Sequence, residues 1–195
     1  MLRFLTAGES HGPGLVAIVE GLPRGLHVDL DGLSAELKRR RHGYGRGARM
    51  AIEQDEVEFL GGVRHGRTLG SPVSVLIRNT EWPKWDKIMS PAASEGGKEV
   101  TRPRPGHADL AGMLKYDTGD ARDILERASA RETAARTVVG YLSRRLLATC
   151  DVEVLSHVVA IGSVEAKAQT PKIEDSDRID EDPVRCLDPQ ASADM

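Results

Sequence analysis

Positive charge is concentrated between Lys38 and Arg49, where six of twelve residues are basic and no carboxylate lies between Glu36 and Glu53. The basic residues are Lys38, Arg39, Arg40, Arg41, Arg46 and Arg49. A guanidinium group binds carboxylates and phosphates through two parallel hydrogen bonds. The stretch is therefore consistent with a pocket for a small, multiply charged anion. An exposed basic face, or cations placed at the C-terminus of a helix, would explain the same residues equally well.

Two histidines occur in segments that would present them at fixed places. His11 lies in G-E-S-H-G-P-G, residues 8–14, a turn-rich sequence between two predicted strands. His107 follows two prolines that stiffen the chain, and Arg104 lies beside it. Either imidazole could transfer a proton near neutral pH. An ordinary surface histidine at position 11 and a helix-capping histidine at position 107 are equally good alternatives.

Arg131 has an unfavourable position in the longest predicted helix, residues 129–148. A cation in the first turn opposes the helix dipole, at a cost of roughly a few tenths of a kcal/mol. The same N-terminus offers free backbone N–H groups to an anion. Ser129 and Glu132 fit a capping box, and Arg136 pairs with Glu132 four residues earlier, so these three have local structural roles. Arg131 has none, and we interpret it as a candidate anion-binding residue.

Apolar periodicity places these groups on a mixture of strands and helices. Strands are predicted at residues 2–6, 15–19, 50–63, 71–78 and 152–164, and helices at residues 31–41, 108–116 and 129–148. The arginine run falls in the last turn of the first helix, and Gly43 follows as a stop signal. Trp82 and Trp85 are predicted to lie in a loop that covers a core or an interface. Residues 90–106 form a long connection of the kind that is often functional, and residues 188–195 have the pattern of a helix beginning.

Composition and charge are those of an ordinary globular protein, and we treat residues 1–195 as one domain. The net charge of −3 is uneven, because residues 165–195 carry 4 basic and 9 acidic side chains while the rest carry 23 and 21. A chain that is not basic overall, with 4% aromatic residues, is unlike a general nucleic-acid binder. We find no apolar run of membrane-spanning length and no signal peptide, so we expect no membrane partner and a cytoplasmic location.

Cys150 and Cys186 are too few and too far apart to suggest a metal site, so we expect no metal and two free thiols. The G-x-G-x-x-G fingerprint of dinucleotide-binding folds is absent as well. Three functions remain open from the residues alone. They are an enzyme with an anionic substrate, a non-enzymatic phosphate- or nucleotide-binding module, and an RNA-binding protein that uses the G-Y-G-R-G loop. The last would bind with an affinity that falls steeply with salt.

Several of these segments, taken together, resemble the chorismate synthase family over the whole chain. The matching segments are G-E-S-H-G at 8–12, R-R-R-H-G-Y-G-R-G-A-R at 39–49, G-V-R-H-G at 62–66, R-P-G-H-A-D at 104–109 and E-R-A-S-A-R-E-T-A at 126–134. R-C-L-D at 185–188 is similar to a later R-C-P-D of the family, with Leu187 where proline is usual. Any one of these motifs would be weak, but five in order at the family spacing are specific.

The resemblance implies an α+β fold, a β-α-β sandwich with helices between antiparallel sheets, assembled as a homotetramer. It implies the anti-1,4-elimination of phosphate from 5-enolpyruvylshikimate 3-phosphate to give chorismate, in aromatic amino acid biosynthesis. The family requires reduced FMN although the reaction has no net redox change, and the hard chemistry belongs to the cofactor. The two carboxylates and the phosphate of the substrate would explain why so many arginines are gathered.

The resemblance also implies roles for residues of this sequence by motif position. The substrate-binding residues would be Arg40, Arg46, Arg49, Arg104 and Arg131. His107 would protonate the departing phosphate, and His11 would hydrogen-bond or protonate the reduced flavin. The residues that match a flavin-contacting segment are Arg127, Ala128 and Ser129. Arg40 and Arg46 are also associated with NADPH in those members that reduce their own flavin.

Members of the family are nearly twice as long as this sequence. The resemblance therefore implies an N-terminal half, truncated at Met195. The other half would supply much of the FMN site, a further arginine and a catalytic acidic residue. We expect this chain alone to bind flavin weakly and to turn over little or no substrate.

Overall fold

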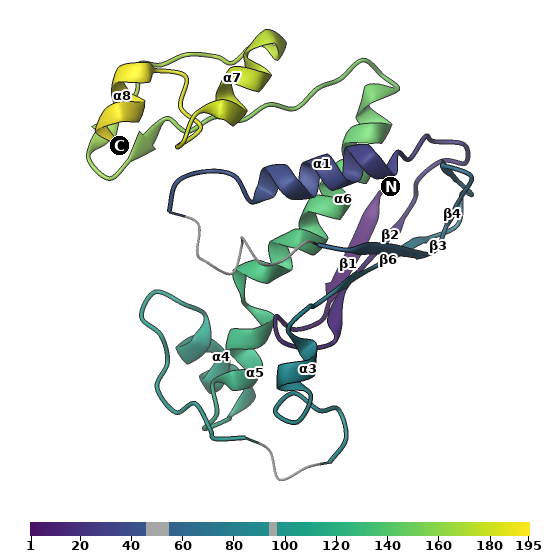
Figure 1. Ribbon diagram of the computed structural model, residues 1–195, viewed down its shortest axis with the longest axis vertical. Coiled ribbons are helices and arrows are strands. Elements are labelled where there is room, and N and C mark those ends of the chain that lie inside the picture. The colour runs from purple at the N-terminus through teal and green to yellow at the C-terminus, as the bar shows by residue number, and fades with distance from the viewer. Residues whose placement is uncertain (46–54, 94–96) are drawn as a thin grey trace.

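A four-stranded antiparallel sheet and two long helices form the centre of the molecule (Figure 1). The structure is a computed structural model that describes residues 1–45, 55–93 and 97–195. The strands lie in the order β1-β2-β6-β3, and they are β1 (Arg3–Ala7), β2 (Gly14–Glu20), β6 (Val73–Arg78) and β3 (Val57–Gly61). β1 and β2 pair as a hairpin, so residues 8–13 form the loop that connects them.

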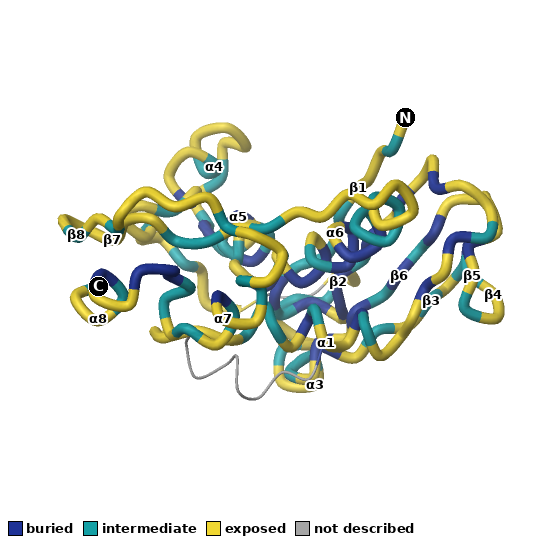
Figure 2. Tube along the Cα trace, turned by 90° about the horizontal axis from the view of Figure 1, so that it is seen from above, coloured by how far each residue is buried: buried dark blue, intermediate teal, exposed yellow. Residues whose placement is uncertain are grey.

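The central strands β2 and β6 bury one face each, because successive side chains of a strand point to opposite faces. The buried side chains, at most 1% exposed, are Leu15, Ala17, Val19, Val73, Val75 and Ile77. Figure 2 shows dark blue buried stretches along both strands. On the opposite face Ile18 is 41% exposed. This alternation fixes the register, since a slip of one residue would expose the whole buried set.

Helices α1 (Leu30–Arg40) and α6 (Thr133–Ala148) pack on the buried face of the sheet (Figure 1). Leu33 and Leu37 of α1 and Val138 and Leu142 of α6 are at most 2% exposed and belong to the same core cluster as the strands. Their spacings of four residues place each pair on one side of its helix. The sheet therefore holds both helices, and the ends of these helices carry several of the predicted site residues.

Tyr141 of α6 ties the two helices together at the start of α1. Its hydroxyl donates to Asp29 O at 2.7 Å and accepts from Asp29 N at 3.0 Å. The carboxylate of Asp29 caps α1 by accepting from two backbone N–H groups of the first turn. Gly32 permits this close approach, because a Cβ there would lie 2.9 Å from Asp29 Oδ2 and 3.2 Å from the Tyr141 hydroxyl.

Short elements connect these layers. They are β4 (Val63–Arg64), which pairs with β5 (Arg67–Thr68), α3 (Trp82–Trp85), α4 (Asp109–Tyr116), α5 (Arg122–Arg127) and the 3-10 helix η1 (Ala130–Glu132). α4 packs against α5, and η1 leads directly into α6. Gly112 allows α4 and α5 to approach, since a Cβ there would lie 2.4 Å from the Ile124 side chain.

The C-terminal segment, residues 152–195, packs mainly on itself. Its elements are β7 (Ala160–Ile161), β8 (Val164–Glu165), the 3-10 helix η2 (Ile173–Asp175), α7 (Ser176–Glu181) and α8 (Pro189–Asp194). Its buried apolar side chains lie outside the main core cluster, and they are Ile179, Cys186, Leu187 and Ala191. Among the residues that the structure describes, no helix is long and apolar enough to cross a membrane.

Most of the predicted elements are confirmed with small shifts at their ends. The strands predicted at 2–6, 15–19 and 71–78 correspond to β1, β2 and β6. The helices predicted at 31–41 and 108–116 correspond to α1 and α4, and the helix expected to begin after residue 188 is α8. The α+β class is also confirmed. Of the strand predicted at 50–63, residues 50–54 lie outside the described residues, and β3 covers 57–61.

Three predictions need correction. The strand predicted at 152–164 is wrong apart from Ala160–Ile161 and Val164, which pair with each other in the short hairpin of β7 and β8. Val158 adds a single bridge to Cys186. Trp82 and Trp85 form the short helix α3 rather than a loop. The helix predicted at 129–148 is divided into η1 and α6, and α5 is an additional helix that the sequence did not reveal.

We expect Leu142→Ala to lower the free energy of unfolding by about 2–5 kcal/mol, because it opens a cavity in the core between α6 and the sheet. Leu142 is 0% exposed. The matched control is Leu114→Ala on α4, where the side chain is 74% exposed and the expected change is within roughly 0.5 kcal/mol. Urea unfolding followed by circular dichroism measures both. Equal losses in the two variants would contradict this description of the core.

Candidate active site

A buried glutamate from α5 holds His11 in the β1–β2 loop. Glu126 Oε2 accepts from His11 N at 3.0 Å and lies 2.7 Å from His11 Nδ1. The same oxygen accepts from Ser10 Oγ at 2.6 Å, and Ser10 N donates to Glu126 O at 3.0 Å. The loop closes tightly at Gly8, whose φ is +98° and whose hypothetical Cβ would lie 2.2 Å from Gly14 O. A fully buried carboxylate thus receives several donors from one loop.

Trp85 of α3 covers one face of the His11 ring. The two ring centroids are 3.9 Å apart and the planes are 24° from parallel. The guanidinium carbon of Arg122 lies 5.6 Å from the Trp85 ring, and Arg122 Nη1 lies 3.7 Å from Glu126 Oε1. We predicted that the two tryptophans would cover a core or an interface. Trp85 instead packs on a candidate catalytic residue.

The first residue of α4, Asp109, gathers Arg104 and His107. Its buried carboxylate accepts from Arg104 N at 3.0 Å, Arg104 Nε at 2.9 Å and Arg104 Nη2 at 3.2 Å. Asp109 Oδ1 also lies 2.5 Å from His107 Nδ1. The hydrogen bond from the Arg104 side chain lowers the pKa of Asp109, and the same bond raises the pKa of Arg104. His107 is therefore fixed at the start of α4 by a carboxylate that Arg104 keeps ionised.

The His11 and His107 groups are neighbours. His11 contacts Glu126 of α5, and His107 contacts Asp109 of α4. These two helices pack against each other. The pKa of Arg104 is raised first by its bond to Asp109 and further by the negative charge of Glu126. The two histidines, 96 positions apart in the sequence, are thus backed by buried carboxylates of adjacent helices.

Arg131 is nearly buried and donates to protein groups through its whole guanidinium. Its Nη1 donates to Asp55, its Nε to Asn79 Oδ1 at 3.0 Å and its Nη2 to Arg78 O at 3.2 Å. The Arg131 side chain is 4% exposed and that of Asp55 is 0% exposed. This ion pair outweighs the unfavourable position of a cation at the start of a helix.

Asp55 also faces two arginines from the end of α1. Arg40 Nη2 donates to Asp55 Oδ2 at 3.0 Å, and Arg41 Nε lies 3.9 Å from the same oxygen. Among the residues that the structure describes, the Asp55 carboxylate therefore faces three guanidinium groups. Arg46 and Arg49, which complete the predicted anion pocket, lie outside the described residues.

Asn79, the residue after β6, connects this arginine group to the His11 loop. Its Nδ2 donates to Glu9 O at 3.0 Å and to Gly12 O at 2.8 Å, while its Oδ1 accepts from Arg131 Nε. The side chain is buried. The amide nitrogen of Asn79 is thus bonded to the His11 loop, and its amide oxygen is bonded to Arg131.

The segment Arg127–Ser129 follows Glu126 directly. Arg127 Nη2 donates to Thr6 O and Thr6 Oγ1, both at 2.9 Å. Arg127 Nη1 is buried and lies 3.8 Å from Glu132 Oε1, but it makes no hydrogen bond among the described residues. Ser129 Oγ accepts from Arg131 N at 3.3 Å. The predicted capping box is incomplete, because the Glu132 carboxylate accepts from Thr6 and Arg136 instead.

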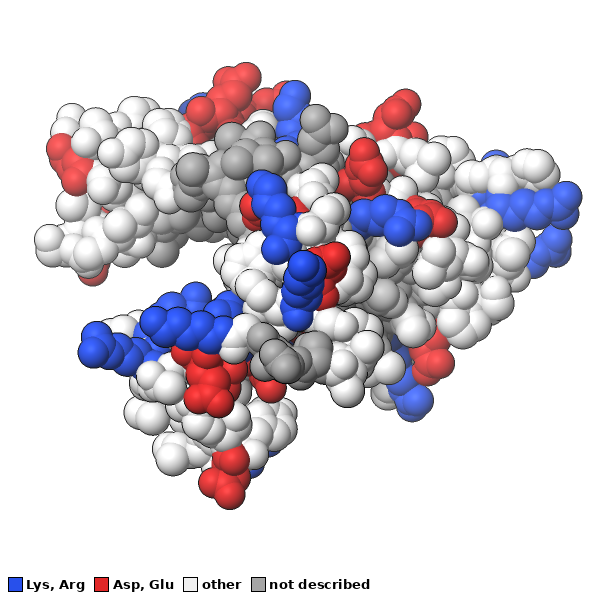
Figure 3. All heavy atoms as spheres, turned by 60° about the horizontal axis from the view of Figure 1, so that its bottom comes forward, with Lys and Arg blue, Asp and Glu red and all other residues white. Residues whose placement is uncertain are grey.

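Acidic and basic side chains are interspersed around the site. Figure 3 shows blue and red groups side by side on the face that it presents. Within the basic stretch, Arg39 donates twice to Glu36, at 2.7 and 3.1 Å. Burial would lower the pKa of Arg39, but the bonds and charges of Glu36 and Asp180 raise it overall. Arg39 therefore fits the interpretation of this stretch as cations at the end of a helix. Arg40 and Arg41 do not fit it as well, because they face Asp55 in the candidate site.

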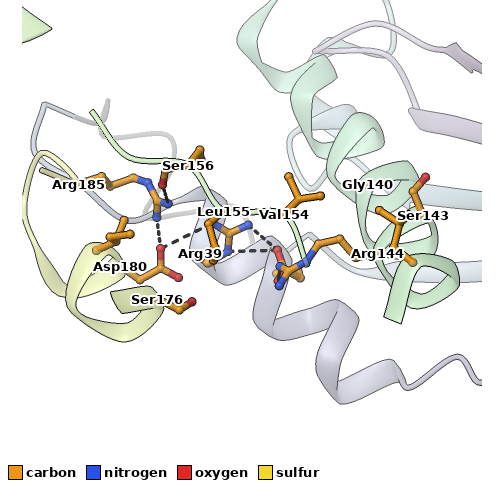
Figure 4. Close-up of a pocket in the computed structure, with 13 residues that line it drawn as sticks. Arg39, Gly140, Ser143, Arg144, Val154, Leu155, Ser156, Ser176, Asp180 and Arg185 are labelled. Carbon is orange, nitrogen blue, oxygen red and sulfur yellow. Dashed lines mark hydrogen bonds and ion pairs between the residues drawn. The ribbon is translucent and has the colours of Figure 1, made fainter. Parts of the chain in front are cut away.

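A separate hollow of about 410 Å³ lies between α1, α6 and the C-terminal segment (Figure 4). Glu36 Oε1 accepts from Arg144 at 2.5 Å, and Asp180 lies 3.7 Å from Arg39 and bonds Arg185. Each arginine shown there has a carboxylate partner (Figure 4). Arg39 belongs to the basic stretch and lines this hollow, but it is paired with Glu36 and Asp180, and none of the described lining residues was assigned a site role by the resemblance. We therefore regard this network as the attachment of the C-terminal segment.

The sequence predicts both histidines and the arginines as site residues, but it does not predict the residues that hold them in the structure. The missed residues are Asp55, Asn79, Trp85, Asp109 and Glu126. Asp109 and Glu126 stand inside two of the matched motifs, R-P-G-H-A-D and E-R-A-S-A-R-E-T-A, which was the available signal. Asp55 and Asn79 carry no such signal, because their partners are distant in the sequence.

Comparison with known proteins identifies relatives of this chain. The family model for chorismate synthase matches residues 2–195. A chorismate synthase of Parafrankia sp. is 60% identical over 202 residues, which cover 99% of this chain and 51% of the relative. A chorismate synthase of Thermobifida fusca is 59% identical over 206 residues, which cover 100% of this chain and 52% of the relative.

The solved structures agree with the sequence matches. A crystal structure of chorismate synthase superposes with a TM-score of 0.75 at 37% identity, covering 99% of this chain and 51% of that one. The chain therefore spans about half the length of the curated relatives it matches.

Asp109→Asn should make the protein less sensitive to acid. A folded-state pKa below the value of about 3.9 for an unfolded aspartate means that Asp109 stabilises the protein above roughly pH 4. That stabilisation is lost as the pH falls through the folded value. The variant should lose about 1–3 kcal/mol near neutral pH, because the donors of Arg104 lose a charged acceptor.

Urea unfolding at several pH values between about 7 and 3 tests this expectation, with Asp123→Asn on the exposed side of α5 as the control. The parent and the control should lose stability steeply at the acid end, and Asp109→Asn should lose less there. A parallel pH dependence in all three proteins would refute the assignment.

Proposed function

This chain belongs to the chorismate synthase family, and we propose that a full-length protein carrying it converts 5-enolpyruvylshikimate 3-phosphate to chorismate. The reaction would be an anti-1,4-elimination of phosphate dependent on reduced FMN, in aromatic amino acid biosynthesis. The observation that carries the proposal is the pairing of a half-exposed Arg104 with His107 on one buried carboxylate. Such a pair can bind a phosphate and give it a proton.

A phosphate bound by Arg104 would lie within reach of His107. Arg104 Nη2 is 3.2 Å from His107 Nε2, and the Arg104 side chain is 49% exposed. Because Asp109 holds the Nδ1 side of the ring, Nε2 is the atom that would donate its proton to the departing phosphate oxygen. Asp109 would also balance the positive charge of the imidazolium before that transfer.

The remaining substrate-binding residues in the proposal are Arg40, Arg46, Arg49 and Arg131. Three arginines face the single carboxylate of Asp55 in the described part of the chain, and this grouping supports the binding of an anion there. Arg131 donates to Asp55, Asn79 and Arg78 in the structure. Its contribution would therefore come from its charge and from its support of Asn79.

We propose that Arg127, Ala128 and Ser129 bind FMN together with His11. The fit is supported by Arg127 Nη1, a buried donor that lies 3.8 Å from Glu132 Oε1 and makes no hydrogen bond among the described residues. A phosphate or ring oxygen would give it one. When bound, reduced FMN would lend electron density as phosphate leaves and take up the ring proton. Arg40 and Arg46 would meet NADPH if the protein reduces its own flavin.

Three further parts of the proposal rest on the sequence. A homotetramer is implied by the family resemblance, whereas a cytoplasmic location and the absence of nucleic-acid and membrane partners are expected from composition, charge and the lack of a long apolar run. The alternative is a phosphate- or nucleotide-binding module without activity, or an inactive fragment. The length of the chain favours this alternative for the 195 residues by themselves, because they span about half of the relatives.

The 195-residue chain alone should release little or no phosphate in an anaerobic assay with 5-enolpyruvylshikimate 3-phosphate and reduced FMN. A full-length form should release phosphate and form chorismate only when reduced FMN is present. Phosphate assay and chorismate absorbance measure both products. Tight flavin binding or turnover by the short chain would contradict the first expectation. A full-length protein without turnover would refute the proposed function.

His107→Ala in the full-length protein should lower kcat by roughly 10²–10⁴-fold, because the proton donor for phosphate departure is lost. KM should change far less, since Arg104 remains to bind the phosphate. His157→Ala is the matched control, because His157 lies in the C-terminal segment and bonds only Gln169 O among the contacts that the structure resolves. An unchanged kcat in His107→Ala would rule out this role.

A further inference from the structure

Glu126 contacts both the backbone and the ring of His11 through a carboxylate oxygen. Its Oε2 is 3.0 Å from His11 N and 2.7 Å from His11 Nδ1. The side chain is 0% exposed. A carboxylate held this far from water is stable only when donors and positive charge surround it.

The donors around Glu126 determine where the proton of the imidazole sits. An ionised carboxylate accepts hydrogen bonds and donates none. The short contact with His11 Nδ1 therefore requires a hydrogen on Nδ1. Ser10 Oγ donates to the same carboxylate oxygen at 2.6 Å, so this hydroxyl proton is not available to Nδ1.

Two further side chains fix the plane of the ring and the charge of the carboxylate. Trp85 stacks on the His11 ring at 3.9 Å between centroids. Arg122 lies over Trp85 and places its Nη1 3.7 Å from Glu126 Oε1, which has no hydrogen-bond partner among the described residues. The ring is thus constrained both in its plane, by Trp85, and about its axis, by Glu126.

We propose that Glu126 is a positioning residue that holds His11 in the Nδ1–H tautomer, so that every proton His11 transfers to or from a ligand passes through Nε2. The identity of that ligand as the reduced flavin rests on the proposed function. The neutral ring presents the Nε2 lone pair to a donor such as a flavin N–H. The imidazolium gives up its Nε2 proton and returns to the same neutral tautomer, with Nδ1–H still bonded to Glu126.

The tautomer of His11 can be measured without any turnover. We would label the imidazole nitrogens with ¹⁵N and record long-range ¹⁵N–¹H spectra at about pH 8.5, where an unperturbed imidazole is neutral. The parent should show the proton on Nδ1. Glu126→Gln preserves the volume but removes the charged acceptor, and free neutral imidazole favours Nε2–H. A shift of His11 toward the Nε2–H tautomer is therefore expected in this variant.

The control is Asp182→Asn, which removes a carboxylate that accepts from Val184 N, Cys186 N and Ser192 Oγ in the C-terminal segment. The His11 spectrum should not change in it. An Nε2–H tautomer in the parent, or identical His11 spectra in the parent and Glu126→Gln, would overturn the proposal. Should Glu126→Gln fail to fold, the tautomer of the parent alone decides.

Activity gives an independent readout in the full-length protein. Glu126→Gln should lower kcat with little change in KM for the phosphate substrate, since the substrate contacts of Arg104 and His107 remain. If Glu126→Gln shifts the tautomer but remains fully active, the tautomer of His11 does not matter for the reaction, and the role of Glu126 in positioning a proton-transfer group is refuted. If the tautomer shifts but the parent makes no chorismate, the proposed function fails while the assignment of Glu126 stands.

Discussion

Compensation of buried charge is the constraint on which the site depends. Asp55, Asp109 and Glu126 all have side chains with no exposed surface, and each would be costly to bury alone. Each is matched by arginine or histidine groups, which lie just before Asp109 in the chain and include groups from distant segments for Asp55 and Glu126. Because Glu126 needs the donors of the His11 loop, α5 must lie under that loop. Because Asp55 needs Arg131 and Arg40, the end of α1 and the start of η1 must meet there.

The arginines divide into two kinds by their surroundings. Arg131 is buried and its donors are engaged by Asp55, Asn79 and Arg78. Arg104 is half exposed and keeps one side of its guanidinium beside an imidazole. The first kind sets the geometry and the electrostatic potential of the region. The second kind can exchange a contact with the protein for a contact with a ligand, and sequence position alone does not separate the two.

The sequence predicts local features of this molecule better than its long-range ones. Leu33 and Leu37 of α1 and the alternation in β6 follow from periodicity, and the structure confirms both elements. Arg131 was identified because it conflicts with the helix dipole, but its partner Asp55 is 76 positions away and no local pattern points to it. The apolar alternation in 152–164 is a real local pattern without a long strand beside it, so most of the segment forms no strand.

Asn79 couples the position of the His11 loop to the position of Arg131. One amide group bonds the His11 loop at Glu9 and Gly12 and bonds Arg131 on its other side. Its donor and acceptor ends are not interchangeable, so loop and arginine must both be in place for either to be satisfied. Local opening of β6 near its C-terminus would release His11 and Arg131 together. The position of His11 and the position of Arg131 are therefore expected to fluctuate together. Both depend on how rigidly the end of strand β6 is held.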